Sequence, residues 1–186
     1  MHILDLAQNS LAAGATFVEI RVREDLPTDL LTIEVQDNGR GMSGDLTRRV
    51  TDPFYTSRTT REVGLGLSLF KEAAERCGGQ LTVESEEGRG TKVCASFRLD
   101  HFDRAPLGDM GETLACLISG NPEVDFIYEH EVNRQSYRLE TREMREILGQ
   151  VGLDDASVLY FIRQDVEKGL KNIGAATFPK IMEVLR

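Results

Sequence analysis

Several common classes of protein need features that this sequence has little of. Its three cysteines, Cys77, Cys94 and Cys116, are scattered and odd in number. We therefore expect neither a disulfide framework nor a cysteine metal site, and we place the chain in the reducing cytoplasm. There is no basic cluster and the net charge is −9, which argues against nucleic acid or an anionic membrane as the main partner. No apolar run approaches the roughly 20 residues of a membrane span, and Asp5 lies where a signal peptide would need apolar residues.

The size and composition are those of an ordinary globular protein. The chain has 186 residues, of which 40% are hydrophobic and 28% are charged, so it can bury a sizeable core without covalent crosslinks. This length suits one domain with an appendage or two small domains. The character of the sequence changes near residue 101, so we expect one unit over residues 1–100 and a C-terminal extension over residues 101–186.

The most informative stretch follows a predicted strand over residues 31–36, where apolar and polar residues alternate. Asp37 comes next, and the five residues after it include Gly39, Gly41 and Met42. A carboxylate at this position can accept a hydrogen bond from the amino group of a base. Because glycine has no Cβ, a flat ring can lie against the main chain. Alone, however, this pattern more often marks a simple turn.

A helix is predicted over residues 2–13, and Gly14 is placed to end it. Asp5 and Asn9 are four residues apart, so they lie on one face of this helix with roughly 5–6 Å between their Cβ atoms. Carboxylate and amide oxygens are ligands that Mg²⁺ accepts. The simpler interpretation of this pair is a polar helix face in water.

Two features later in the chain point to a phosphate site. Residues 43–63 are polar and hydroxyl-rich, with Phe54 as an apolar anchor, and a long segment of this kind is more typical of a lid than of a surface loop. Residues 64–67, Gly-Leu-Gly-Leu, then open a predicted helix, whose N-terminal N–H groups suit a phosphate. A helix start that only packs tightly is the alternative. The spacing of the glycines matches neither a P-loop nor a dinucleotide fingerprint.

Short periodic segments predict the remaining elements. Alternation before residue 100 predicts an antiparallel sheet with one covered face, with strands over 18–23, 31–36, 81–84 and 91–99. The second half shows apolar periodicity but no cluster of residues with evident chemistry. It predicts a linker over 101–108, helices over 110–118, 141–148 and 155–170, strands over 124–132 and 136–139, and a loose tail from 171.

Five pieces stand in one order along the chain: Asn9 with an acid on the first helix, Asp37 with its glycines, Phe54, the turn at 64–67, and a Gly-Arg-Gly-Thr hairpin at 88–91. In this order they resemble the ATP-binding domain shared by sensor histidine kinases, type II topoisomerases, the large heat-shock chaperones and mismatch-repair ATPases (the Bergerat fold of the GHKL superfamily). The resemblance implies an α+β fold: a two-layer α/β sandwich with helices over a mixed, mainly antiparallel sheet, followed by a small α+β appendage.

Two branches of that superfamily compete for the closest resemblance. Residues 8–16 are similar to the mismatch-repair ATPases, whereas residues 53–57, 64–69 and 77–79 look like the histidine kinases. The kinase-like segments are the longer match, so we place the chain nearer the kinases. We expect a stand-alone form without the phosphoacceptor hairpin of a sensor kinase. His130 is followed by an acid, as phosphoacceptor histidines are, but a surface histidine is the interpretation that we favour.

The resemblance also implies a role for each matched residue. Asn9 would hold Mg²⁺ at the phosphates, and Asp37 would accept a hydrogen bond from the adenine amino group. Gly41 would lie beneath the base, and Thr91 would help through water. The nucleotide contacts implied are Asn9, Asp37, Gly39, Gly41, Met42, Phe54, Arg58, Gly64, Leu65, Gly66, Leu67 and Thr91.

Asp5 is the candidate catalytic residue, because it stands where the hydrolytic members carry a glutamate that activates water. Aspartate is shorter by roughly 1.5 Å, and misplacement by such a distance weakens catalysis on the order of a hundredfold. We therefore expect slow hydrolysis, or an acid that only orients the waters of the metal. Arg58 and Arg61, within a lid over residues 52–63, are expected to contact phosphate.

Three hypotheses follow. The first is a histidine-kinase-like enzyme that binds ATP and Mg²⁺ and transfers the γ-phosphate to a partner protein in trans. The second is a slow ATPase that acts as a nucleotide-dependent switch or regulator of a partner. The third is a non-catalytic adaptor with a degenerate pocket. We expect a protein partner to bind residues 101–186, we expect no nucleic acid and no membrane, and we leave a homodimer open.

Overall fold

The computed structural model describes residues 2–50 and 66–175. Helices and strands appear there in nearly the order and extent that the sequence predicts. In chain order they are α1 (His2–Ala12), β1 (Phe17–Asp25), β2 (Leu30–Asp37), α2 (Gly44–Arg49), α3 (Gly66–Arg76), β3 (Leu81–Glu86), β4 (Gly90–Arg98), α4 (Met110–Gly120), β5 (Asp125–Val132), β6 (Gln135–Glu140), α5 (Thr141–Leu148) and α6 (Ala156–Asn172).

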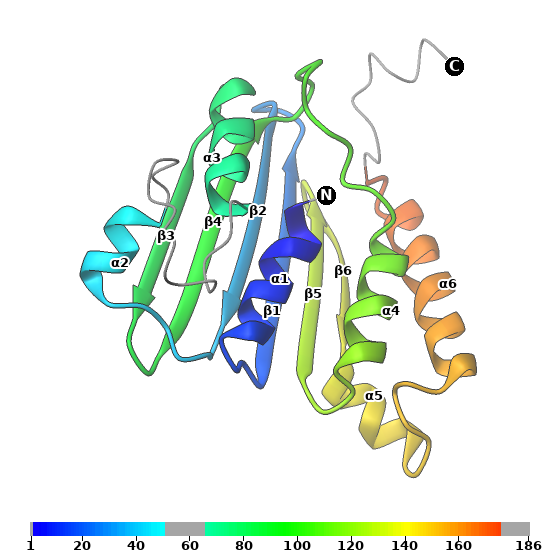
Figure 1. Cartoon of the computed structure of the whole chain (residues 1–186). Helices are drawn as coiled ribbons and strands as arrows, with labels where there is room; N and C mark the ends of the chain where they lie inside the picture. Colours follow the sequence, from blue (N-terminus) through cyan, green and yellow to red (C-terminus); the bar gives the residue numbers. More distant parts are fainter. Residues whose placement is uncertain (1, 51–65, 176–186) are drawn as a thin grey trace.

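Strands from both halves of the chain form one six-stranded sheet, in the order β3-β4-β2-β1-β5-β6 (Figure 1). Neighbouring strands are antiparallel except for β1 and β5, which run parallel, with Phe17 aligned to Asp125. The predicted α+β fold with a mixed, mainly antiparallel sheet is therefore confirmed. The second half of the chain extends this sheet rather than packing beside it.

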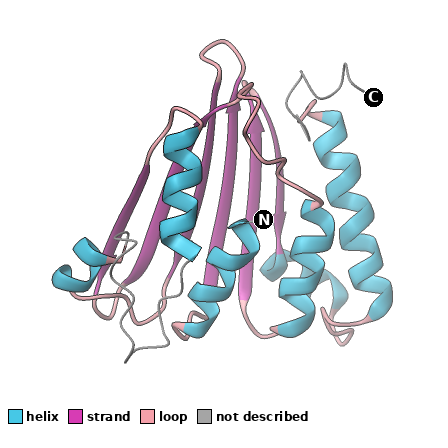
Figure 2. Ribbon diagram, turned by 45° about the horizontal axis from the view of Figure 1, so that its top comes forward, coloured by secondary structure: helices cyan, strands magenta, loops and turns pink. Residues whose placement is uncertain are grey.

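Among the described residues, four helices cover one face of the sheet. In β1, Val18, Ile20 and Val22 are at most 1% exposed, and α1, α3, α4 and α6 lie over this face (Figure 2). The opposite face is polar, and its charges are paired: Arg21 contacts Glu19 at 2.7 Å and Glu34 at 3.1 Å. The result is a two-layer sandwich whose core lies between the helices and one side of the sheet. None of the helices in the described ranges is long and apolar enough to cross a membrane.

The segment after Asp37 is more ordered than the flexible cover predicted over residues 43–63. Its first part forms α2, which begins after Ser43 because the Ser43 side chain caps the helix by accepting a hydrogen bond from the backbone N–H of Leu46 at 3.4 Å. Residues 51–65, which include the rest of the expected lid, lie outside the described part of the chain.

The segment 101–108, predicted to be a linker, is held against the core by a buried arginine. Arg104 is only 4% exposed, and its Nε donates a hydrogen bond to the backbone oxygen of Leu99 at 2.6 Å. Leu107 is also buried. This segment therefore packs against the helical side of the sheet on its way to α4.

His130 differs from both interpretations of the sequence, because it is neither a surface residue nor an accessible phosphoacceptor. It is 1% exposed. Its Nε2 lies 2.8 Å from a carboxylate oxygen of Glu24, and its Nδ1 lies 2.7 Å from the Tyr128 hydroxyl. Glu24 and Tyr128 are themselves fully buried. A buried polar group is costly unless it is hydrogen-bonded, so these three side chains stabilise one another between β1 and β5.

An ion-pair cluster fixes the start of β5 to α5. Asp125 accepts hydrogen bonds from Arg142, at 2.7 Å, and from Arg145. Arg145 also donates to the backbone oxygens of Pro122 at 2.7 Å and Val124 at 2.8 Å. Burial alone would raise the pKa of Asp125, but the hydrogen bonds from the two arginines outweigh this effect and lower the pKa.

Replacing Asp125 by Asn should destabilise the protein at pH 7 by about 1–2 kcal/mol, because a hydrogen bond to a charged group is lost and two arginines remain. A carboxyl whose folded-state pKa is depressed contributes stability above its unfolded pKa of about 3.9 and loses it as pH falls through the folded value. The difference between Asp125→Asn and wild type should therefore shrink below pH 4 in urea unfolding measured across pH.

The matched control is Glu123→Gln, which removes an exposed carboxylate two residues earlier. This variant should unfold like wild type at every pH. A stability loss for Asp125→Asn that stayed constant down to pH 2 would contradict the assigned role of the carboxylate.

Candidate functional site

The carboxylate of Asp37 lies at the end of β2 and is held by three separate parts of the chain. Its Oδ2 accepts a hydrogen bond from the Ser10 hydroxyl of α1 at 2.7 Å. Its Oδ1 accepts from the backbone N–H of Gly39 at 2.8 Å and from that of Thr91 at 3.3 Å. The residue is 7% exposed. An ionised carboxylate has about four acceptor positions, so one remains for a further donor.

Two loops pack backbone against backbone beside Asp37. Gly41 has a φ of +66°, and a Cβ added to it would lie 2.0 Å from the backbone oxygen of Glu86. Gly90 has a φ of +104°, and a Cβ there would lie 1.9 Å from the backbone oxygen of Asp37. Only glycine fits such contacts, since it has no Cβ and readily adopts positive φ. The close packing of these two loops therefore requires glycine at positions 41 and 90.

Ser85 connects the loop after Asp37 to β4. Its hydroxyl accepts a hydrogen bond from the backbone N–H of Met42 at 2.8 Å and donates to the backbone oxygen of Gly90 at 3.0 Å. It also lies 2.9 Å from the hydroxyl of Thr91. Met42 and Thr91, predicted separately as nucleotide contacts, are therefore joined by one side chain.

Asn38 fixes the other side of the same loop. Its Oδ1 accepts hydrogen bonds from the backbone N–H groups of Thr16 and Phe17, both at 2.9 Å, and its Nδ2 donates to the Thr16 hydroxyl at 2.9 Å. This ties the residues after Asp37 to the start of β1. The backbone N–H of Arg40 also donates to the oxygen of Ala13 at 3.0 Å, so the loop is anchored to the end of α1 as well.

Sequence reasoning missed the positioning roles of Ser10, Ser85 and Asn38. For Ser10 a signal existed, because it continues the buried stripe of α1 formed by Ile3, Leu6 and Ala7. A hydroxyl within an apolar stripe needs a buried partner, and that partner is Asp37. Ser85 and Asn38 sit in ordinary polar positions, so nothing in the sequence distinguishes them.

Asp5 and Asn9 lie one turn apart on α1, as predicted. Asp5 is exposed and Asn9 is half-buried. Within the described ranges, no hydrogen bond joins the Asn9 carboxamide to another residue. These ranges contain no group of three or more His, Cys, Asp or Glu side chains placed to hold a metal. The donor set nevertheless fits Mg²⁺, which takes few protein oxygens and completes its shell with water and substrate phosphates.

The expected phosphate turn falls at a boundary of the described residues. Gly66 is the first residue of α3, and Leu67, the second residue of this helix, is buried. Gly64 and Leu65 lie outside the described part, together with the predicted lid contacts Phe54, Arg58 and Arg61. The structure thus brings together the Asp37 loop, Thr91 and α1, and the roles of the lid residues remain predictions.

Comparison with known proteins gives the family context of this site. The family model described as histidine kinase-, DNA gyrase B-, and HSP90-like ATPase matches residues 2–101. Sporulation kinase E of Bacillus subtilis is 41% identical over 78 residues, and Sensor protein kinase FleS of Pseudomonas aeruginosa is 36% identical over 110 residues. These matches span 42% and 59% of this chain, but only 10% and 27% of the two kinases.

A solved structure described as the N-terminal domain of a DNA repair protein shares the fold. It has a TM-score of 0.51 and 17% sequence identity, over 75% of this chain and 51% of that one. The family model covers the helix with Asn9, the Asp37 loop and the hairpin with Thr91, and membership in this family implies ATP binding. The chain therefore belongs to the histidine kinase-, DNA gyrase B- and HSP90-like ATPases.

Proposed function

We propose that the protein binds ATP together with Mg²⁺ and transfers the γ-phosphate to a partner protein in trans. The observation that carries this proposal is the Asp37 carboxylate, oriented by three donors and left with one acceptor position. The family relationship implies ATP as the ligand, and kinases are among the relatives of this chain.

In this proposal Asp37 accepts the hydrogen bond of the adenine amino group at that remaining position. The base then lies beside Gly39, Gly41 and Met42, whose backbone is already fixed by the contacts to β3, β4 and α1. Thr91 contributes its hydroxyl next to the carboxylate. Because these groups are preorganised, little conformational freedom is lost when the base binds.

The polar face of α1 serves the phosphates. Asn9 supplies a ligand oxygen for the metal, and Asp5, one turn earlier and exposed, orients water around it. Bound Mg²⁺ would neutralise negative charge on the phosphates during transfer. The backbone at Gly64–Leu67 caps the phosphates at the start of α3, with Arg58 and Arg61 as lid contacts.

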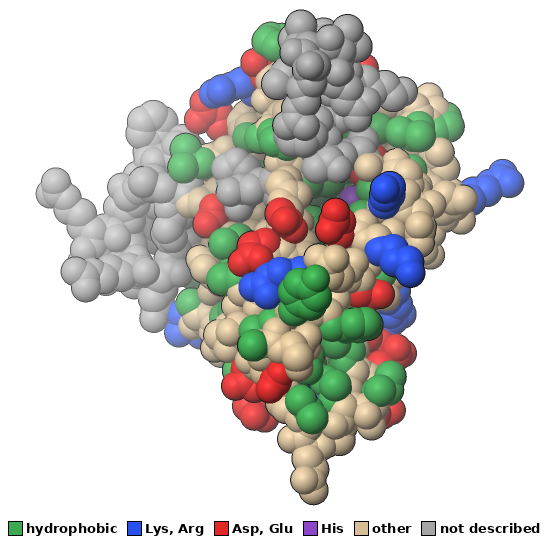
Figure 3. Space-filling view, turned by 90° about the vertical axis from the view of Figure 1, so that its right-hand side faces the viewer, with side chains coloured by type: hydrophobic (Ala, Val, Ile, Leu, Met, Phe, Trp, Pro, Cys, Tyr) green, Lys and Arg blue, Asp and Glu red, His purple; other side chains and the backbone are tan. Residues whose placement is uncertain are grey.

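The phosphoryl acceptor lies on another protein in this proposal, since His130 is buried. We place this partner on exposed apolar side chains in the second half of the chain. Ile147 of α5 is 85% exposed, and Tyr160 and Phe161 of α6 are 63% and 58% exposed. Figure 3, which faces this side of the molecule, shows hydrophobic side chains gathered on its lower part. In this proposal the reaction takes place in the cytoplasm. The alternative partner for this surface is a second copy of the chain, which would form a homodimer.

A second candidate function, a slow ATPase switch, is favoured by the continuity of the sheet. Asp37 is aligned with Val18 of β1, and Val18 is aligned with Phe126 of β5. The backbone N–H of Phe126 in turn donates to the hydroxyl of Thr141, the first residue of α5, at 2.8 Å. A movement of the Asp37 loop on nucleotide binding would thus reach α5 through three adjacent strands.

The first test is incubation with γ-labelled ATP and Mg²⁺, with and without cell extract. Asn9→Ala removes the proposed metal ligand, so transfer should fall by at least tenfold, while Gln8→Ala, the exposed neighbour on α1, should behave as wild type. Label on a second protein, lost in Asn9→Ala, is the expected result.

Release of label only as free phosphate, again lost in Asn9→Ala, would overturn the kinase proposal in favour of the switch. In that case protease sensitivity of α5 and α6 should change with ATP. No turnover and no thermal stabilisation by ATP with Mg²⁺ would contradict both functions.

A pair of glycine variants tests the architecture of the nucleotide site. Gly90→Ala places a Cβ against the backbone oxygen of Asp37, whereas a Cβ at Gly88, which also has positive φ, meets nothing within 4 Å. Gly88→Ala should lose about 1 kcal/mol of stability from backbone strain alone, and Gly90→Ala should lose more, because its Cβ also displaces the backbone at Asp37. Only Gly90→Ala should also weaken ATP binding, by about tenfold or more, in titration calorimetry. Equal affinities of the two folded variants would show that Asp37 does not determine nucleotide affinity.

A further inference from the structure

Half of the large apolar side chains that are exposed in the described ranges belong to the last turn of α5, the loop after it and the first turns of α6. They are Ile147, Val151, Tyr160 and Phe161, and we call them the α5–α6 surface. The loop is compact, since the backbone N–H of Val151 donates to the oxygen of Leu148 at 3.2 Å and that of Asp155 to the oxygen of Gly152 at 3.2 Å. Exposed apolar residues gathered in this way mark an interaction site.

Residues 176–186 lie outside the described part of the chain, but their sequence has a pattern of its own. Apolar residues follow the spacing i, i+3, i+4, i+7, at Phe178, Ile181, Met182 and Leu185. This spacing predicts one apolar face of a helix. A helix of this length is marginal in water by itself, so we expect the segment to need a surface on which its apolar face is buried.

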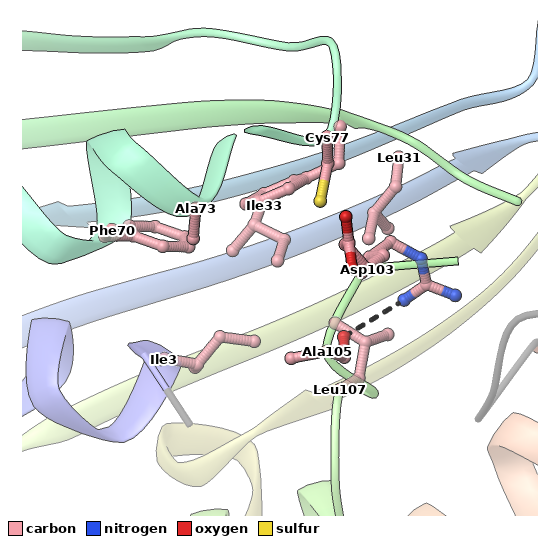
Figure 4. Close-up of a pocket in the computed structure, with 11 residues that line it drawn as sticks. Ile3, Leu31, Ile33, Phe70, Ala73, Cys77, Asp103, Ala105 and Leu107 are labelled. Atoms are coloured by element: carbon pink, nitrogen blue, oxygen red, sulfur yellow. Dashed lines mark hydrogen bonds between the residues drawn. The ribbon is translucent and has the colours of Figure 1, made fainter. Parts of the chain in front are cut away.

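An internal cavity among the described residues does not provide that surface. It lies between α1, α3 and β2, where Ile3, Ile33 and Phe70 line it (Figure 4). Its volume is about 60 Å³, which is room for roughly four to six water-sized groups. The apolar face of the segment consists of four large side chains, so it requires an open surface rather than this cavity.

The segment reaches the α5–α6 surface of its own chain poorly. Ala175, the last described residue, follows Tyr160 by 15 residues, which corresponds to about 22 Å along α6. Two extended residues and an eight-residue helix span only about 19 Å from Ala175. Most of the helix would therefore lie along the outer side of α6, where the exposed residues are polar: Gln164, Glu167, Lys168 and Lys171.

We propose that residues 178–185 of a second copy of the chain pack their apolar face on the α5–α6 surface, and that the two copies exchange these segments reciprocally. A segment from another copy is free of the length limit, because α6 does not fix where that copy lies. Each contact repeats the other, as a twofold dimer requires. The proposed function assigns a protein partner to the same surface, so the dimer would withhold it from that partner, but the dimer does not depend on the transfer reaction.

The charges on the two sides of this contact are opposite in sign. Near the α5–α6 surface in the chain the exposed acids are Glu143, Glu146, Asp154 and Asp155, whereas Arg142, an exposed base on α5, is already paired with Asp125 at 2.7 Å. The segment carries two bases and one acid: Lys180, Arg186 and Glu183. Complementary charge of this kind favours the encounter of the two copies and fixes their register.

The test is analytical ultracentrifugation of the full chain over a series of concentrations, without ATP. Wild type should form a dimer. Ile181→Asp places a charge in the apolar face of the segment and Phe161→Asp places one on the α5–α6 surface, so each should raise the dimer dissociation constant at least tenfold. The matched controls add the same charge beside each site: Thr177→Asp, one residue before the apolar face, and Gln164→Asp, on the polar outer side of α6, should dimerise as wild type does.

A mixture of the Ile181→Asp and Phe161→Asp chains identifies the two sides of the contact. Each mixed pair keeps one intact contact, between the segment of the Phe161→Asp chain and the surface of the Ile181→Asp chain. The mixture should therefore dimerise more strongly than either variant alone. If Phe161→Asp lowers the melting temperature, Tyr160→Asp at the neighbouring exposed position takes its place.

Three results would each overturn the proposal. Wild type that stays monomeric at its highest soluble concentration would mean that its own segment or a different protein covers the α5–α6 surface. An unchanged dimer in Ile181→Asp would mean that the surfaces of two copies pack directly on each other. A mixture that dimerises no better than its components would show that the segment and the surface are not partners.

Discussion

The parallel pairing of β1 with β5 is the constraint on which the architecture depends. It joins residues of the family domain to the second half of the chain in one sheet, and it places Glu24 and His130 in contact inside the core. Burying a glutamate and a histidine is tolerated only because each satisfies the other, with Tyr128 completing the set. Removing β5 would therefore expose an edge of the sheet and leave Glu24 without His130 in an apolar core.

The proposed nucleotide site applies the same principle for a different purpose. Asp37 is a buried carboxylate whose cost is offset by three hydrogen bonds, and the loops around it are held by Asn38 and Ser85 rather than by apolar packing. This arrangement fixes the direction of the carboxylate before any ligand arrives. Groups that are already ordered lose less conformational entropy when a ligand binds, so more of the contact energy remains as affinity. The constrained backbone around Asp37 has this effect.

Much of the local structure was predictable from the sequence, because hydrophobic periodicity and glycine signals act over short distances. The helix at Thr141–Leu148 agrees with its predicted bounds, and β5 and β6 agree within a residue or two. The glycines beside Asp37 drew attention to its carboxylate, and its contact with the nucleotide stays a prediction. The parallel partner of β1, the burial of His130 and the hydroxyl of Ser10 on Asp37 were not, since each depends on residues far apart in the sequence. The packing of residues 101–108 through Arg104 likewise follows from tertiary contacts that no local pattern records.

The position of β5 in the sheet also affects how the protein is made. During synthesis β1 emerges early, but the strand that pairs with its free edge follows only after β2, β3, β4 and α4. Until then the nascent chain carries an unpaired edge, and such edges invite association with other chains. Pairing between distant segments also raises the contact order and slows folding. Closure of the β1–β5 seam would thus be a late step of folding, and until it occurs the nascent chain would expose an edge that can associate with other chains.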